Sequence, residues 1–105
     1  MATPELDDKI YMYVRSEDKR RWADLASEEE IETAQWIRRS LRRAPERDQP
    51  LRLEEEGPFD TTLTLRLNSD AKNLYADRAH REGLTLAAWV RQELNAAADR
   101  EEQGG

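Results

Sequence analysis

Apolar and polar side chains alternate along two short segments of this chain, residues 9–14 and residues 62–67. In both segments the apolar side chains occupy every second position: Ile10, Met12, Val14, Leu63, Leu65 and Leu67. A period of two is typical of a β-strand that buries one face and leaves the other in water. Both segments are therefore predicted to be half-buried strands.

Each predicted strand precedes two segments in which apolar residues recur at helical spacing. Ser16 and Asn68 are residue types that cap helix N-termini, and each is closely followed by acidic residues, which a helix dipole favours there. We expect a first helix after each strand, ending near Glu29 and Glu82. The second helices have wider apolar stripes, formed by Ala34, Trp36, Ile37, Leu41 and Ala44 and by Leu86, Trp89, Val90, Leu94 and Ala97.

The whole pattern repeats at a spacing of 53 residues. Residues 9–44 align with residues 62–97 without a gap, and 11 of the 36 aligned positions are identical. One strand and two short helices bury too little surface to fold alone, and a lone strand has no partner for its backbone hydrogen bonds. The two units must therefore pair, either within one chain or between two chains. This predicts a mostly helical α+β fold, in which four helices pack on a two-stranded antiparallel ribbon.

Three further segments complete the predicted organisation. Residues 45–61 form an acidic linker between the units, because their prolines and glycine exclude a continuous helix. Residues 1–8 and residues 98–105 are short and charged, and both are predicted to be disordered.

The composition excludes several classes of protein. The chain has no cysteine and a single histidine, His80, so disulfides, thiolate metal sites and histidine-based metal or catalytic sites are not expected. No apolar run approaches the roughly 18 residues of a transmembrane helix, and the acidic N-terminus is unlike a secretory signal. We therefore expect a cytoplasmic protein that is not an enzyme and has no cofactor, metal or membrane partner.

The net charge of −6 argues at first against nucleic acid as a partner. The charge is unevenly distributed, however: residues 9–44 have a net charge of +2, residues 62–97 have a net charge of +1, and the remaining segments total −9. The repeated units are thus slightly basic. This distribution predicts weak non-specific binding, and it does not exclude a nucleic-acid partner.

The second unit contains the most recognisable motifs of the chain. They are the alternating strand of residues 62–67, the turn Gly83-Leu84-Thr85 and the helical segment Trp89-Val90-Arg91. In this order the motifs resemble the ribbon-helix-helix superfamily of Arc-, MetJ- and CopG-like repressors. The first unit departs from the pattern at the turn, where Glu30 replaces glycine and Glu32 replaces the capping serine or threonine. Two copies in one chain imply a tandem ribbon-helix-helix fold, that is, a pseudo-dimer.

The resemblance also implies which residues contact DNA. In that superfamily the ribbon lies in the major groove, outward side chains of each strand contact base edges, and the start of each second helix holds a phosphate. The implied base contacts are Lys9, Tyr11, Tyr13, Thr62, Thr64 and Arg66. The implied phosphate contacts are Thr85 and Leu86. If the strands pair about Tyr11 and Thr64, then Lys9 faces Arg66 and Tyr13 faces Thr62.

The chemistry of the six outward residues is compatible with base contacts. Arginine and lysine donate hydrogen bonds to guanine, and threonine can contact the thymine methyl group. Like charges that face each other across a ribbon are also easier to accommodate beside an anion. A simpler interpretation is that the polar face is only solvated, with the tyrosines packed on linker residues 51–59 or on another protein.

The two units differ at the predicted phosphate position. Thr85 precedes a neutral helix N-terminus, which suits an anion. Glu32 follows Glu28, Glu29 and Glu30 and would repel an anion at the equivalent place. Alternatively, these acids only complement the helix dipole. In either case we expect the first unit to hold DNA more weakly at this point.

The expected function is sequence-specific binding of double-stranded DNA, as a transcriptional repressor or regulator that is associated with the nucleoid when bound. A second copy of the chain is a further expected partner if the units pair between chains. The alternative is a protein-interaction module, such as an antitoxin or adaptor, in which DNA binding is secondary or lost. The acidic linker and tail favour this alternative, because they suit a partner protein.

Overall fold

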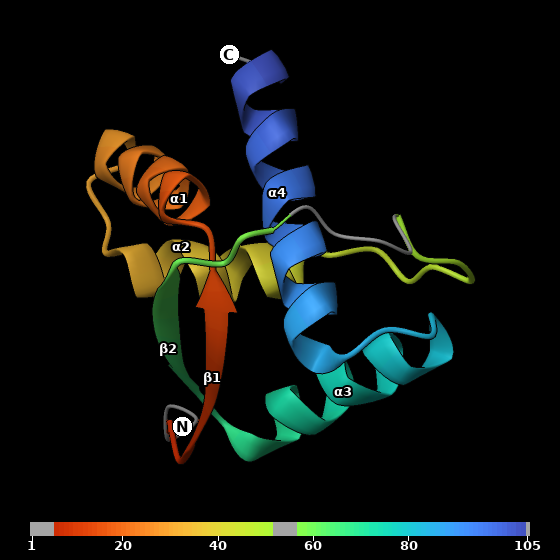
Figure 1. Ribbon diagram of the computed structural model, residues 1–105. Coiled ribbons are helices and arrows are strands. Elements are labelled where there is room, and N and C mark those ends of the chain that lie inside the picture. Colours follow the sequence, from red (N-terminus) through yellow and green to blue (C-terminus); the bar gives the residue numbers. More distant parts are fainter. Residues whose placement is uncertain (1–5, 52–56, 105) are drawn as a thin grey trace.

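The computed structural model describes residues 6–51 and 57–104. In chain order its elements are strand β1 (Asp8–Val14), helix α1 (Ser16–Glu28), helix α2 (Thr33–Arg42), strand β2 (Thr61–Leu67), helix α3 (Ser69–Arg81) and helix α4 (Leu86–Gly104). The predicted fold class is confirmed in its coarse form, since the described residues make a mostly helical α+β structure with a two-stranded antiparallel sheet and four helices (Figure 1). Within these described ranges, no helix is long and apolar enough to cross a membrane.

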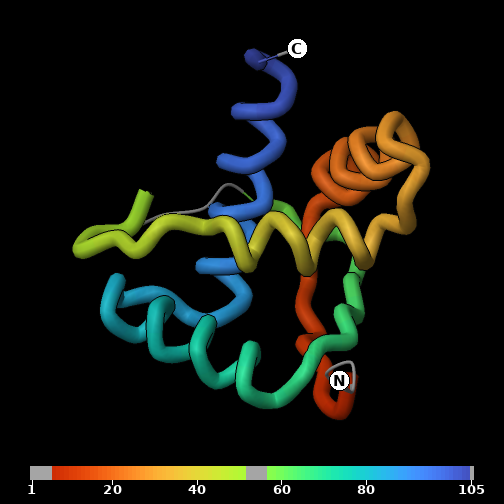
Figure 2. The backbone as a smooth tube through the Cα atoms, turned by 180° about the vertical axis from the view of Figure 1, so that it is seen from behind, coloured from red at the N-terminus to blue at the C-terminus, as the bar shows by residue number. Residues whose placement is uncertain are grey.

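Strands β1 and β2 form an antiparallel ribbon within the one chain. Tyr11 pairs with Thr64, so the outward pairs are those expected for that register: Lys9–Arg66, Tyr11–Thr64 and Tyr13–Thr62. The apolar side chains of both strands are buried on the other face. The ribbon therefore has one covered and one open face, and α2 crosses behind it in Figure 1 and in front of it in Figure 2.

The covered face of the ribbon belongs to a hydrophobic core that takes side chains from all six elements. Trp22, Trp36 and Trp89 are its largest fully buried side chains, in agreement with their apolar helical positions. Tyr75 stacks on Trp89 with the two ring centroids 5.3 Å apart. Because both units supply this core, neither unit has a core of its own.

The first helix of each unit is capped by an aspartate that directly precedes the strand of the other unit. The carboxylate of Asp60, which precedes β2, accepts hydrogen bonds from the backbone N–H (2.8 Å) and the hydroxyl of Ser16 at the start of α1. The carboxylate of Asp7, which precedes β1, accepts the same two bonds from Ser69 at the start of α3, with 2.9 Å to the backbone nitrogen. Asp7 and Asp60 are themselves 53 residues apart. The repeat therefore includes a reciprocal exchange of helix caps.

The second helices are attached to the ribbon by a similar exchange. The Arg38 guanidinium of α2 donates a hydrogen bond of 3.0 Å to the backbone carbonyl of Arg66 in β2. The Arg91 guanidinium of α4 donates one of 2.7 Å to the backbone carbonyl of Tyr13 in β1. Each second helix therefore contacts the strand of the other unit, so the two units are interlocked.

The turns inside the two units share one backbone conformation. Gly83, between α3 and α4, has a φ of +75°, in the left-handed region that glycine adopts without a Cβ clash. Glu30, at the equivalent position between α1 and α2, has a φ of 60°. The first unit thus keeps the turn without the glycine, and it carries the backbone strain of a side chain in this region.

One predicted helix cap is corrected by the structure and another is confirmed. Ser16 was predicted to cap α1, but it is the first helical residue, with Arg15 at the cap position and the capping carboxylate supplied by Asp60. Asn68 is the N-cap of α3, as predicted, and its side chain accepts a hydrogen bond of 2.7 Å from the Ala71 N–H.

The C-terminal residues are helical, which corrects the prediction of a disordered tail from residue 98. Helix α4 continues to Gly104, and its last turns contact the first unit. Arg21 of α1 pairs with Glu102 at 2.7 Å, and the Trp36 indole N–H of α2 donates to Glu101 at 2.8 Å. Glu101 and Glu102 contributed to the prediction of a disordered tail, and these same residues attach the segment to the first unit.

The predicted N-terminal segment and linker are described only in part. Of residues 1–8, Asp7 caps α3 and Asp8 begins β1, so these two residues are ordered, and residues 1–5 lie outside the described residues. Of the linker at 45–61, residues 52–56 lie outside the described residues, and the last residue, Thr61, already belongs to β2.

Candidate nucleic-acid interface

The open face of the ribbon brings together all six residues that were predicted to contact bases. They are the outward residues of β1 and β2: Lys9, Tyr11, Tyr13, Thr62, Thr64 and Arg66. Five of these side chains are exposed, and Thr62 is half-buried. None of the six is acidic. We call the surface that they form the ribbon face.

Two tyrosines dominate the apolar part of the ribbon face. Tyr11 and Tyr13 are 59% and 57% exposed, and their rings make an edge-to-face contact with centroids 5.9 Å apart. Such exposure shows that the described part of the linker does not cover them. Phe59 of the linker instead packs against the Arg91 guanidinium, whose central carbon is 4.2 Å from the ring centroid. Two large aromatic side chains are thus presented to solvent.

Lys9 and Arg66 form the cationic part of the ribbon face. They are directly opposite each other across the two strands, where like charges repel. In the part of the chain that the structure describes, neither side chain has a hydrogen bond or an ion pair. An anion or a set of hydrogen-bond acceptors placed above them would relieve this repulsion.

The acid nearest to this cation pair in sequence is Asp8, and its charge is already balanced. Its carboxylate accepts a hydrogen bond of 2.7 Å from the Lys9 backbone N–H and pairs with the Lys72 ammonium at 3.3 Å. The backbone hydrogen bond, with a smaller contribution from Lys72, holds the pKa of Asp8 below its ordinary value. Asp8 therefore stays ionised and bound, and it leaves the cations of Lys9 and Arg66 uncompensated.

The N-terminal ends of α2 and α4 lie on opposite sides of the ribbon in Figures 1 and 2. At the start of α4 the Thr85 hydroxyl oxygen accepts a hydrogen bond of 3.1 Å from the Ala88 N–H, as expected for a cap, and its O–H is still able to donate. Leu86 is the first helical residue, and the first N–H groups of an α-helix have no partner within the helix. This end is neutral and can hold a phosphate.

The equivalent end of α2 is acidic. Glu32 is the N-cap residue, and its backbone N–H donates to the Gln35 side chain at 3.2 Å. Of the acids that precede it, Glu29 is bound by Arg39, which lowers the pKa of Glu29, while Glu30 is exposed. A negative charge at the cap position suits the helix dipole but opposes a phosphate. The two sides of the ribbon are therefore electrostatically different.

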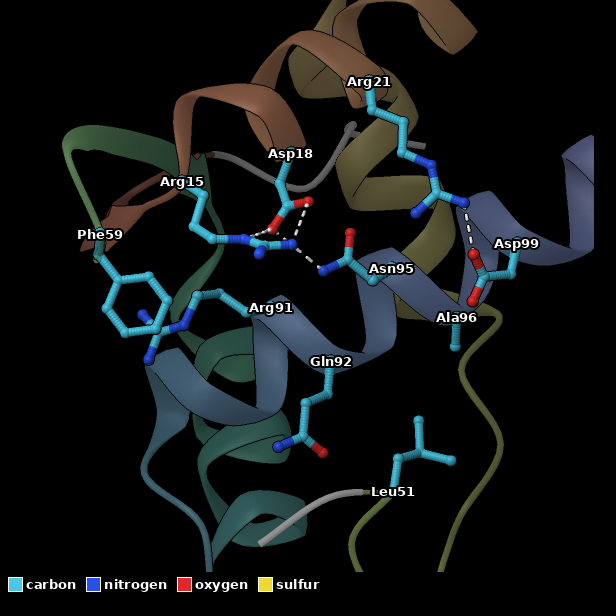
Figure 3. A pocket seen from close by; sticks show the side chains of 10 residues that line it. All are labelled: Arg15, Asp18, Arg21, Leu51, Phe59, Arg91, Gln92, Asn95, Ala96 and Asp99. Carbon is cyan, nitrogen blue, oxygen red and sulfur yellow. Dashed lines mark hydrogen bonds and ion pairs between the residues drawn. The ribbon is translucent and has the colours of Figure 1, made fainter. Parts of the chain in front are cut away.

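A cavity of about 410 Å³ lies apart from the ribbon face, between α1, α4 and the linker. Its polar wall is shown in Figure 3: Arg15 donates to both carboxylate oxygens of Asp18 (3.0 and 3.2 Å), and the Asn95 amide donates to the same carboxylate at 3.3 Å. Asn95 in turn accepts a hydrogen bond of 3.1 Å from the Trp22 indole. These groups bind one another, so the network attaches α1 to α4.

Two sets of residues that attach the helices to the ribbon and to each other were not predicted from the sequence. Arg38 and Arg91, which fix the second helices to the ribbon, are one of the identical pairs of the repeat, and that identity was the available signal. Asp18 aligns with Ala71, so the repeat gave no signal for the Asp18 network. Among the described residues there is no group of three potential metal ligands from His, Cys, Asp and Glu.

Comparisons of this chain with models of protein families, with curated proteins and with solved structures found no match. The chemistry of the ribbon face and of the helix ends beside it is therefore the main guide to function.

Proposed function

We propose that this protein binds double-stranded DNA in a sequence-specific manner, as a transcriptional repressor or regulator. In this proposal the chain is a tandem ribbon-helix-helix protein, and its ribbon face enters the major groove. Lys9, Arg66 and the threonines donate hydrogen bonds to base edges, and the tyrosine rings contact thymine methyl groups. The Thr85 hydroxyl and the Leu86 N–H hold a phosphate beside the ribbon.

The observation that carries the proposal is the composition of the ribbon face. Alternation alone requires only polar side chains on the solvent side of a strand. Here the outward positions instead expose two aromatic rings and two opposed cations without partners in the described residues, and they include no acid. A strand face that contacts only water does not require exposed aromatic rings or facing cations. A ligand with hydrogen-bond acceptors and methyl groups can contact both.

The interlocked architecture supports the pseudo-dimer in the proposal. The helix–strand contacts of Arg38 and Arg91 cross from one unit to the other, and Asp7 and Asp60, which precede β1 and β2, each cap the first helix of the opposite unit. This is the arrangement expected of two intertwined copies of one motif. The covalent linkage of the copies leaves a single ribbon and two flanking helix ends for one DNA site.

The proposal is tested by the double variant Arg66→Ala/Tyr11→Ala. We first select a duplex from random DNA with the wild-type protein and then measure affinity by fluorescence anisotropy at moderate salt. Each lost base contact costs about 1–3 kcal/mol, so the double variant is expected to bind the selected duplex at least tenfold more weakly.

The matched control is Arg81→Ala/Leu74→Ala, which removes an arginine and a large apolar side chain from exposed positions of α3. Its affinity is expected to remain within about twofold of wild type, because surface substitutions of this kind have small effects. Unchanged specific binding by Arg66→Ala/Tyr11→Ala, or equal losses for both double variants, would show that the ribbon face is not the DNA-binding surface.

A further inference from the structure

The ribbon face differs in chemistry between its two ends. Strand pairing places both cations, Lys9 and Arg66, at one end, and Tyr13 with Thr62 at the other. The 53-residue repeat relates Lys9 to Thr62, Tyr11 to Thr64 and Tyr13 to Arg66. A symmetric ribbon would have the same side chain at both members of each related pair, and here every related pair differs in chemistry. The backbone is nearly symmetric, whereas the side chains on its open face are not.

The cation end is suited to base pairs that present acceptors. Lys9 and Arg66 are exposed, face each other, and have no side-chain partner in the described residues. Guanine presents two acceptors, N7 and O6, at its major-groove edge, and arginine or lysine donates to them. Two neighbouring guanines would also relieve the repulsion between the two cations.

The tyrosine end is suited to methyl groups. Tyr13 and Tyr11 form an exposed aromatic pair, and Thr62 opposite Tyr13 adds a small side chain with a methyl group. The backbone at Tyr13 is fixed from below by the hydrogen bond from Arg91. Thymine is the base that presents a methyl group in the major groove. None of the outward residues at this end is charged.

We propose that the ribbon face is polarised, so that the protein binds a non-palindromic duplex in a single orientation. Guanine-containing base pairs contact Lys9 and Arg66, and thymine-rich base pairs contact Tyr11, Tyr13 and Thr62. This proposal rests on the proposed function and adds the class of DNA sequence and the direction in which it is read.

The first test uses the duplexes that the wild-type protein selects from random DNA. We expect an enriched site with guanines in one half and thymines in the other. A palindromic or otherwise symmetric site would overturn the polarity and leave the proposed function standing. If no duplex is enriched above non-specific binding, the proposed function itself fails, and the polarity fails with it.

A pair of variants then assigns each half of the site to its residues. Lys9→Thr/Arg66→Thr is expected to lose roughly ten- to a hundredfold in the preference for the guanines, while the preference for the thymines is retained. Tyr13→Thr, the matched variant of the other end, is expected to lose only the preference for the thymines. Circular dichroism verifies that both variants are folded. Equal losses at both halves from either variant would overturn the assignment.

The orientation is measured with a DNA-cleaving probe on a single thiol, because the natural chain has no cysteine. Asp70→Cys places an iron chelate in the first turn of α3, beyond the cation end of the ribbon, and Glu17→Cys places it at the equivalent position of α1, beyond the tyrosine end. We expect the first probe to cut next to the guanine half of the site and the second next to the thymine half. If each probe cuts both ends equally, the protein binds in both orientations and the proposal is wrong.

Discussion

Glu30 occupies a position in the turn of the first unit where the backbone has a positive φ, a conformation that favours glycine. Its φ of 60° is equivalent to that of Gly83, but its side chain crowds the backbone in this region. The substitution Glu30→Gly is expected to raise the free energy of unfolding by about 0.5–1 kcal/mol, because relief of the strain outweighs the greater freedom of glycine in the unfolded chain. The midpoint of urea denaturation measures this change.

Gly83→Ala is the matched variant in the second unit. An added Cβ at Gly83 would meet no atom within 4 Å, so the cost comes from the positive φ alone. The free energy of unfolding is expected to fall by about 1 kcal/mol. A denaturation midpoint for Glu30→Gly at or below that of the wild type would contradict this account of the turn.

Glu82 is a buried carboxylate whose charge is unfavourable in the folded protein. Burial raises its pKa, as does the neighbouring Glu93, while a hydrogen bond of 3.0 Å from the Trp89 indole and the charges of Arg47 and Arg78 oppose the rise. A raised folded pKa means that the folded state holds the proton more tightly than the unfolded state. Stability is therefore lost as the pH rises through the pKa of Glu82.

The neutral variant Glu82→Gln is consequently expected to be more stable than the wild type near pH 7. The difference should shrink as the pH falls below the ordinary carboxyl value, because the wild-type side chain is then also neutral in both states. Thermal denaturation midpoints over a series of pH values provide the measurement. A stability difference that does not vary with pH would contradict the raised pKa.

At the scale of the elements, the C-terminal end of α4 differs most clearly from α2, because it contacts the first unit. Glu101 accepts the indole N–H of the fully buried Trp36, which no other described residue accepts. The substitution Glu101→Ala leaves this donor without its partner and is expected to lower the free energy of unfolding by about 1–2 kcal/mol. Chemical denaturation followed by tryptophan fluorescence measures the loss.

Arg100→Ala is the control for this prediction, since Arg100 is an exposed neighbour on the same turns of α4. Its effect on stability is expected to stay within about 0.5 kcal/mol. Similar losses for both variants would mean that helix content, rather than the contact with Trp36, sets the stability of this segment.

The strands and their outward side chains could be predicted from the sequence because they rest on a local pattern. Alternation determines which side chains of β1 and β2 are outward, whereas the register of the two strands could be stated only on the condition that they pair about Tyr11 and Thr64. The same pattern placed all six residues of the ribbon face on one surface. The outward positions follow from a period of two, which a single sequence displays directly.

The caps from Asp7 and Asp60 and the end of α4 could not be predicted because their partners are distant in sequence. Asp60 is 44 residues from Ser16, and Asp7 is 62 residues from Ser69. Acidic residues in a linker or tail look like solvated surface until the residue that they bind is known. The charge network of Asp18 was missed for the same reason, since Asn95 is 77 residues away.

At the scale of the whole molecule, the ribbon closes within a single chain. Both strands, all four described helices and the common core come from one copy. We therefore expect sedimentation equilibrium to give a mass near 12.3 kDa at micromolar concentration. A mass of about twice this value would contradict this expectation.

The reciprocal caps also mean that the linker has a role beyond connection. If the linker were cut, each half would lack a strand partner, a core and a helix cap until it met the other half, so assembly would depend on concentration. The intact linker replaces that encounter by an intramolecular one, whose effective concentration depends on the length of the linker. It also fixes the stoichiometry, because every molecule contains one copy of each strand.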